Sequence, residues 1–166
     1  MRGQVSVCID ASPSTVFGLI SDVTRIGEFS PETFEGQWLD GATGPALGAR
    51  FRGHVRRNGR GPVYWTSCTV TSYEKEREFA FTVDVAGSPV NTWGYRLRPA
   101  GDGTLLTEWF ALRPTVLNRL YWTAAGRWRG RTNQRGMEAT LARVKTVAEA
   151  GSDACAARDS NPEPAG

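Results

Sequence analysis

The chain has 166 residues, of which 40% are hydrophobic and 22% charged, and its formal net charge at pH 7 is +3. These values indicate one soluble domain that can bury a core, and they argue against a nucleic-acid-binding protein because the charge is low and no binding motif is present. No apolar run is long enough for a membrane span or a signal peptide, so we expect a cytoplasmic protein with no integral membrane association.

The amino-terminal part predicts one strand and two short helices. Residues 4–10 alternate apolar and polar side chains, as a strand with one buried face does. Ser12 can cap a helix that begins at the following proline, and Asp22 can cap a second short helix over residues 23–28. A second strand is predicted over residues 34–39.

The strongest strand signal lies between residues 46 and 112. Apolar side chains recur there at every second position in five segments, 49–54, 63–73, 78–85, 91–98 and 104–112. Short turns rich in glycine, asparagine and proline separate these segments. Because parallel strands need long crossovers, the pattern predicts an antiparallel sheet, with an aromatic face that another element must cover.

A long helix near the carboxyl end is the expected cover. One stripe of an amphipathic helix is formed by Met137, Leu141, Val144 and Ala148. The helix is expected to end at Gly151, and residues 116–135 before it are typical of a helix interrupted by glycines. The sequence therefore predicts one domain over residues 1–150, followed by a disordered tail over residues 151–166.

This order of elements resembles the START/Bet v 1-like (SRPBCC) superfamily, and in particular its bacterial polyketide cyclase/dehydratase-like branch. The motifs that carry the resemblance are ASPSTVF at residues 11–17, FSPE at 29–32, GARFRG at 48–53 and MEATL at 137–141. In the first motif a serine is inserted before the proline relative to the usual family pattern. The resemblance covers about residues 4–149 and implies an α+β helix-grip fold. In that fold a curved antiparallel sheet of about seven strands wraps around the final helix, with two short helices after the first strand.

The resemblance also implies a cavity between sheet and helix for a hydrophobic ligand, such as a lipid, a polyketide or an aromatic metabolite. Two functions remain open: a protein that only binds such a molecule, and a cyclase, aromatase or dehydratase that acts on it without a metal or nucleotide cofactor. A third alternative is an interaction protein whose arginine-rich residues 127–135 meet an acidic partner or a membrane surface. Both a monomer and a homodimer remain open.

Glu108 and His54 are the candidate catalytic residues. Glu108 shares the strand parity of Leu106 and Phe110, so its carboxyl is expected on the apolar face, where burial raises a pKa and favours acid/base chemistry. A salt bridge with an arginine is the alternative role. His54 is the only histidine, but parity points it outward with Arg52, so the alternative is an ordinary surface side chain.

Ten further residues are candidates for contacts with the ligand, because they are aromatic or carry hydrogen-bonding groups on the predicted strands or in the loop before the second strand. They are Glu32, Trp38, Phe51, Tyr64, Trp65, Phe81, Asn91, Trp93, Tyr95 and Trp109. Each aromatic side chain can equally belong to the core, and the polar ones can orient an oxygenated ligand in an apolar pocket. With one histidine and no cysteine cluster, no metal site is expected.

Overall fold

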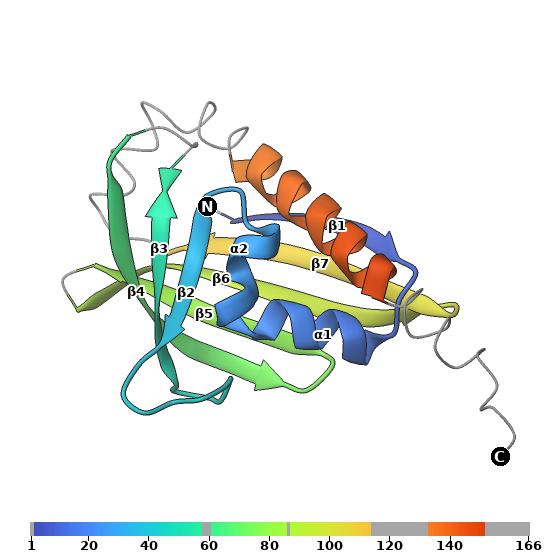
Figure 1. The fold of residues 1–166 in the computed structure, drawn as a ribbon, viewed down its shortest axis with the longest axis horizontal. Helices are drawn as coiled ribbons and strands as arrows, with labels where there is room; N and C mark the ends of the chain where they lie inside the picture. Colours follow the sequence, from blue (N-terminus) through green and yellow to red (C-terminus); the bar gives the residue numbers. More distant parts are fainter. Residues whose placement is uncertain (1, 58–60, 86, 114–132, 152–166) are drawn as a thin grey trace, which may run out of the picture.

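The computed structural model describes residues 2–57, 61–85, 87–113 and 133–151, and within them it confirms the expected α+β fold (Figure 1). Seven strands form one antiparallel sheet in the order β1-β7-β6-β5-β4-β3-β2. The elements are β1 (Arg2–Ile9), α1 (Pro13–Ser21), the 3-10 helix η1 (Val23–Arg25), α2 (Ile26–Phe29), β2 (Thr33–Trp38), β3 (Arg50–Arg56), β4 (Val63–Glu74), β5 (Glu78–Val85), β6 (Ser88–Ala100) and β7 (Gly103–Leu112). A carboxy-terminal helix follows over residues 133–151.

Two local signals set the path of the chain after β1, and both were predicted. The hydroxyl of Ser12 accepts a hydrogen bond from the Thr15 amide at 3.1 Å and caps α1, whose first residue is Pro13. The carboxylate of Asp22 accepts a hydrogen bond from the Thr24 amide at 3.0 Å and starts η1. These caps satisfy backbone donors that would otherwise lack partners where each helix begins.

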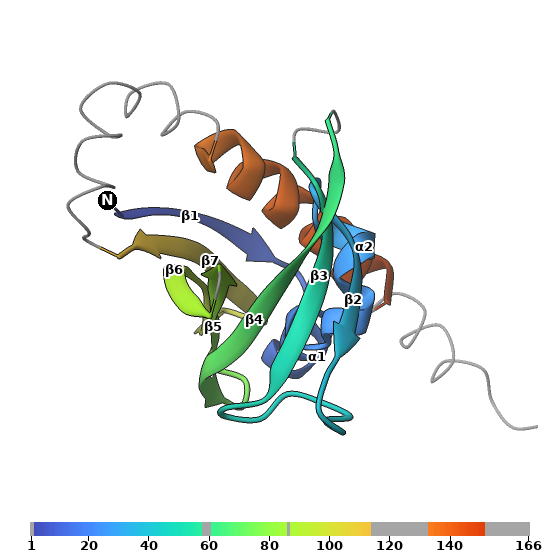
Figure 2. The same cartoon turned by 90° about the vertical axis from the view of Figure 1, so that its left-hand side faces the viewer.

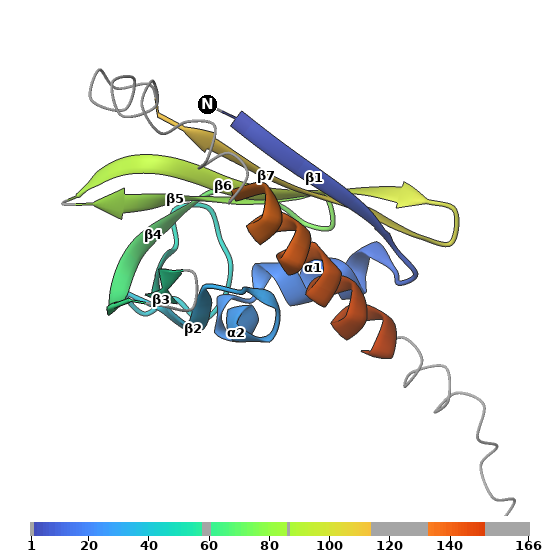
Figure 3. The same ribbon diagram turned by 90° about the horizontal axis from the view of Figure 1, so that it is seen from above.

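The helices all lie on the concave side of the sheet. Figure 1 shows the carboxy-terminal helix crossing this side, and Figure 3 shows α1 and α2 on the same side of β1, β5, β6 and β7. The bend of the sheet is clearest in Figure 2, where β2, β3 and β4 turn away from the remaining strands. The largest fully buried side chains of the described residues come from all these layers: Phe29, Phe51, Phe79, Ile9, Leu106, Leu141, Val16, Val70, Val144 and Thr104.

The carboxy-terminal helix presents the stripe that its sequence predicts. Met137, Leu141, Val144 and Ala148 are all at most 2% exposed. Residues 114–132 and 152–166 lie outside the described residues, and with them most of the interrupted region 116–135 and most of the arginine-rich stretch 127–135. The predicted tail also lies outside them except for Gly151, which belongs to the helix. None of the described helices is both long and apolar enough to cross a membrane.

Two features fix the edges of the sheet against the helices. At one edge, Lys145 of the carboxy-terminal helix donates a hydrogen bond to the Cys8 carbonyl at 2.8 Å, and Glu149 accepts one from the Asp10 amide at 2.8 Å. At the other edge, β2 is interrupted by a bulge near its start and then packs directly on η1. Gly36 permits this contact, since a side chain there would collide with the Val23 carbonyl.

Candidate functional site

The side chain of Glu108 is an isolated acid on the concave face of the sheet. It is 5% exposed, and its direct cross-strand neighbours are Tyr95 on β6 and Val5 on β1. The Tyr95 hydroxyl donates a long hydrogen bond of 3.4 Å to Glu108 Oε1, while Oε2 is buried and has no hydrogen-bond partner. The predicted parity of Glu108 is therefore confirmed, but its partner is a tyrosine rather than an arginine.

Burial controls the protonation of this pair. Removal from water disfavours the carboxylate and raises the pKa of Glu108 to about 8, and the hydrogen bond from Tyr95 lowers it only in part. Burial, together with the nearby carboxyl, also raises the pKa of Tyr95 well above its ordinary value. The raised pKa favours the neutral acid at neutral pH, so Oε2 can carry a proton and act as a hydrogen-bond donor.

Glu108 lies at the boundary between a closed and an open part of the concave face. On one side of it the inward side chains, such as Phe79, Leu97 and Leu106, are fully buried. On the other side most inward side chains are only half-buried: Phe81, Val83, Asn91, Trp93 and Leu112. Asn91 also has a buried side-chain oxygen without a hydrogen-bond partner. The polar atoms that lack partners on this face thus lie where the packing opens.

Aromatic rings form two contacting groups on the concave face. Phe51 makes edge contacts with Trp38 at 5.7 Å and with Phe81 at 5.0 Å between ring centroids. Further along, Trp93 contacts Phe110 at 5.3 Å. Four of the predicted ligand-binding residues, Trp38, Phe51, Phe81 and Trp93, are therefore on the same face as Tyr95 and Glu108. Phe51 is fully buried and belongs to the core, whereas the other three are half-buried.

A groove of about 300 Å³ opens between β1 and the carboxy-terminal helix. Its lining comes from Val5, Ser6, Val7, Glu138, Leu141, Ala142 and Lys145. Glu108 does not line this groove, but Val5, which does, is the cross-strand neighbour of Glu108. No sequence pattern indicated the groove, because it depends on the distance between the helix and the edge strand.

The convex face carries three of the predicted site residues, which are thereby separated from Glu108. His54 stacks on Trp65 with 4.1 Å between ring centroids and faces outward, as its parity predicted. Trp109 is the immediate neighbour of Glu108 in β7 and so faces the opposite side, where its ring covers Gly94. His54, Trp65 and Trp109 therefore do not line the space between the sheet and the helix, because neighbouring strand residues alternate between the faces.

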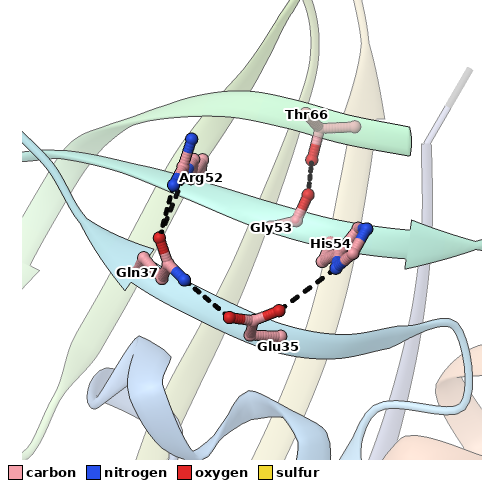
Figure 4. A network of polar contacts seen from close by, with 6 residues as sticks. All are labelled: Glu35, Gln37, Arg52, Gly53, His54 and Thr66. Atoms are coloured by element: carbon pink, nitrogen blue, oxygen red, sulfur yellow. Dashed lines mark hydrogen bonds and ion pairs between the residues drawn. The ribbon is translucent and has the colours of Figure 1, made fainter. Parts of the chain in front are cut away.

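His54 takes part in a surface hydrogen-bond network (Figure 4). Its Nδ1 lies 3.1 Å from Glu35 Oε2, Glu35 Oε1 accepts a hydrogen bond from Gln37, and Gln37 in turn accepts two from Arg52. Hydrogen bonds from His54 and then Gln37 hold the pKa of Glu35 below its ordinary value. The histidine is thus engaged with a surface carboxylate, away from the apolar face.

Two further candidates lie near the end of the β3–β4 hairpin. The Glu32 carbonyl accepts a hydrogen bond from the Arg56 amide at 2.8 Å, which fixes the loop before β2. Tyr64 is on the inner face of β4, but it is exposed because no described helix covers this end of the hairpin. Neither residue is brought into contact with Glu108.

Other chemistry on the concave face is limited. Cys68 is buried there, and burial raises the pKa of its thiol to about 12, so it is not a nucleophile at neutral pH. Within the described ranges, no three His, Cys, Asp or Glu side chains are grouped as metal ligands would be. Glu108 and Tyr95 remain the ionisable pair of this face.

The fold and this buried pair define a helix-grip protein with an apolar, acid-bearing concave face. Residues 2–149 match the family described as "Polyketide cyclase / dehydrase and lipid transport", and the chain belongs to this family. The match confirms the resemblance to the polyketide cyclase/dehydratase-like branch of the SRPBCC superfamily. No curated protein matches the sequence significantly.

Several solved structures share the fold. The Polyketide_cyc-like protein Cgl2372 of Corynebacterium glutamicum is 29% identical, with a TM-score of 0.56 over 89% of this chain and 91% of that one. The protein TTHA0849 of Thermus thermophilus is 14% identical, with a TM-score of 0.68 over 92% and 99% of the two chains. NE0264 of Nitrosomonas europaea is 12% identical, with a TM-score of 0.68 over 92% and 97%. The last two comparisons show the fold alone.

Proposed function

We propose that this protein binds a hydrophobic small molecule with at least one oxygen group between the concave face of the sheet and the carboxy-terminal helix. The observation that carries the proposal is the buried Glu108 Oε2, which has no hydrogen-bond partner. A buried polar atom without a partner costs about 1–3 kcal/mol of folding free energy. A ligand oxygen that accepts a hydrogen bond from the protonated Oε2 would recover part of that cost.

The surroundings of Glu108 indicate the kind of ligand. Half-buried Phe81 and Trp93 offer flat apolar surface, and the Asn91 oxygen offers an acceptor about four strand residues from Tyr95. Four residues of strand span roughly 13 Å. A neutral, elongated aromatic or polyketide-like molecule with oxygen groups towards both ends fits this arrangement. A carboxylate ligand does not, because its charge would be desolvated beside Glu108 without a cation.

Binding of 2-naphthol and of naphthalene, followed by fluorescence at pH 6.5, tests this proposal. The two probes differ by one hydroxyl, so Glu108 should favour 2-naphthol by about fivefold to tenfold, the size of one hydrogen bond. Glu108→Leu should abolish this preference, and Glu35→Gln on the opposite face should keep it. Equal affinities of the wild-type protein for both probes, or no binding of either, would contradict the proposal. Native mass spectrometry of the freshly purified protein would reveal a co-purified ligand directly.

An enzyme of the dehydratase or cyclase kind is the second candidate, and the raised pKa of Glu108 favours it. With a pKa of about 8, the acid and the carboxylate are both accessible near neutral pH. In a dehydration, the carboxylate would take a proton from the carbon next to a carbonyl. The same carboxyl would then protonate the departing hydroxyl, which leaves as water, so that Glu108 ends in its initial state.

Glu108→Gln separates the two functions. Glutamine keeps a hydrogen-bond donor but cannot exchange a proton, so a binding protein should keep its affinity within about threefold. An enzyme should lose about 10²- to 10⁴-fold in turnover of a β-hydroxy-ketone substrate while retaining binding. His54→Ala is the matched control, because His54 lies on the convex face and should change neither quantity.

A further inference from the structure

The end of the β3–β4 hairpin, together with the start of β2, carries exposed apolar and cationic side chains. We name this surface the hairpin-tip patch and define it by Phe34, Val63, Tyr64, Trp65, Arg52, Arg56 and Arg57. Its four apolar members are 38–47% exposed, and they are four of the seven large hydrophobic side chains that are exposed among the described residues. Figure 2 shows this hairpin projecting at one end of the molecule.

Apart from Tyr64, which lies on the inner face of β4, the patch is on the convex face. Phe34 contacts His54 at 4.5 Å between ring centroids, and His54 stacks on Trp65. The guanidinium of Arg52 lies 4.3 Å from the Trp65 ring, and that of Arg56 lies 5.9 Å from the Phe34 ring. The arginines and the rings thus form one surface in which positive charge lies beside exposed apolar area.

The charge of the patch is positive. Arg52, Arg56 and Arg57 contribute three cations, and the carboxylates nearby are Glu32 and Glu35. Glu35 is occupied by hydrogen bonds within the network of Figure 4, and Glu32 is half-buried in the loop before β2. Arg56 and Arg57 are exposed, so their guanidinium groups can bind phosphate oxygens in the paired geometry that this group favours.

We propose that the hairpin-tip patch docks the protein onto the surface of an anionic lipid bilayer. Aromatic rings of this kind lie at the headgroup level of membranes, and each arginine near an anionic surface contributes about 1 kcal/mol. A projecting tip needs no shape complementarity to enter a fluid interface, whereas a protein partner or a nucleic acid would need a matching surface. This inference does not depend on Glu108 and goes beyond the proposed ligand binding.

Flotation of the full chain with lipid vesicles tests the inference. We expect the wild-type protein to float with vesicles of phosphatidylcholine and phosphatidylglycerol, to bind phosphatidylcholine alone much more weakly, and to dissociate as salt is raised. Phe34→Ala with Trp65→Ala, and separately Arg56→Glu with Arg57→Glu, should each weaken binding by about tenfold or more. The matched control is Leu47→Ala with Arg98→Glu, which removes an exposed apolar side chain and an exposed arginine outside the patch.

Each outcome decides the proposal once circular dichroism has shown that the variants are folded. The arginine pair is exposed and outside the core, so this variant keeps the test valid even if the aromatic variant is unstable. Loss of binding in both patch variants, with the control unchanged, supports the proposal. Absence of wild-type binding, equal binding to neutral and anionic vesicles, or unchanged binding of both patch variants would overturn it.

Discussion

The two faces of the sheet treat a glutamate in opposite ways. On the concave face Glu108 is buried beside apolar side chains and one tyrosine, and its pKa rises to about 8. On the convex face Glu35 accepts hydrogen bonds from His54 and Gln37, and its pKa falls below the ordinary value. The same side chain is therefore a neutral acid on one face and a structural carboxylate on the other. The contrast shows that solvent exposure and nearby hydrogen-bond donors, rather than the residue type, determine which carboxyl can do acid/base chemistry.

The largest difference in stability between variants of the two faces is expected for their aromatic residues. Phe51→Ala removes a fully buried ring and should lower the free energy of unfolding by about 3–5 kcal/mol. Trp65→Ala on the convex face should cost about 1 kcal/mol, because that ring is exposed and mainly loses its contacts with His54 and Arg52. Urea denaturation measures both values. Equal losses would show that the concave face is not the packed one.

The pH dependence of stability should distinguish the two carboxyls. The folded-state pKa of Glu108 is raised, so its contribution is fully present below about pH 4.5 and is lost as the pH rises to about 8, by up to about 1.4 kcal/mol per pH unit. Glu108→Gln removes this loss. The free energy of unfolding of the variant relative to the wild type should therefore be about 2–4 kcal/mol larger at pH 8.5 than at pH 5. Thermal unfolding across this range is the measurement, and parallel curves for the variant and the wild type would contradict the assignment.

Close packing is not confined to the concave face. At Gly94, on the convex side, a Cβ atom would lie 2.5 Å from the Trp109 ring, so Gly94→Ala should cost about 1–3 kcal/mol. Gly18→Ala in α1 is the matched control, because no atom lies within 4 Å of its added Cβ, and it should stabilise the protein by up to about 1 kcal/mol. Chemical denaturation of the two variants should give opposite signs.

The smallest change is expected for Glu35→Gln. This side chain is on the surface, where solvent screens its interactions. The folded-state pKa of Glu35 is lowered, so its contribution is present above the ordinary pKa of 4.5 and disappears as the pH falls further. The difference in melting temperature between the variant and the wild type should therefore be small at pH 7 and vanish in acid. A difference that grows towards acid pH would contradict this picture.

The sequence predicted much of the fold because its signals were local. The period of two along the strands, the caps at Ser12 and Asp22, and the stripe of the final helix each depend on a few neighbouring residues, and all were confirmed. The position of Glu108 on the apolar face followed from the same parity. Its partner did not, because the pairing of Tyr95 with Glu108 depends on the register between two strands.

The alternation of side chains along a strand also predicts which face the tryptophans occupy. Trp109 and Glu108 are adjacent in one strand and must face opposite sides, so the alternation itself separates Trp109 from the acid. Trp65 is separated in the same way from its inward neighbour Thr66. The width of the groove beside Val5 could not be predicted, since it is set by how closely the final helix approaches β1.

The edges of the sheet have a consequence for behaviour at high concentration. An open antiparallel sheet has two edge strands, and unpaired backbone groups on such strands can recruit strands of other molecules. Here the lysine on the final helix binds a carbonyl of β1, and the bulge near the start of β2 interrupts the regular spacing of that edge. Each edge is therefore interrupted at one point. Such interruptions lower the tendency of a sheet edge to pair with another molecule.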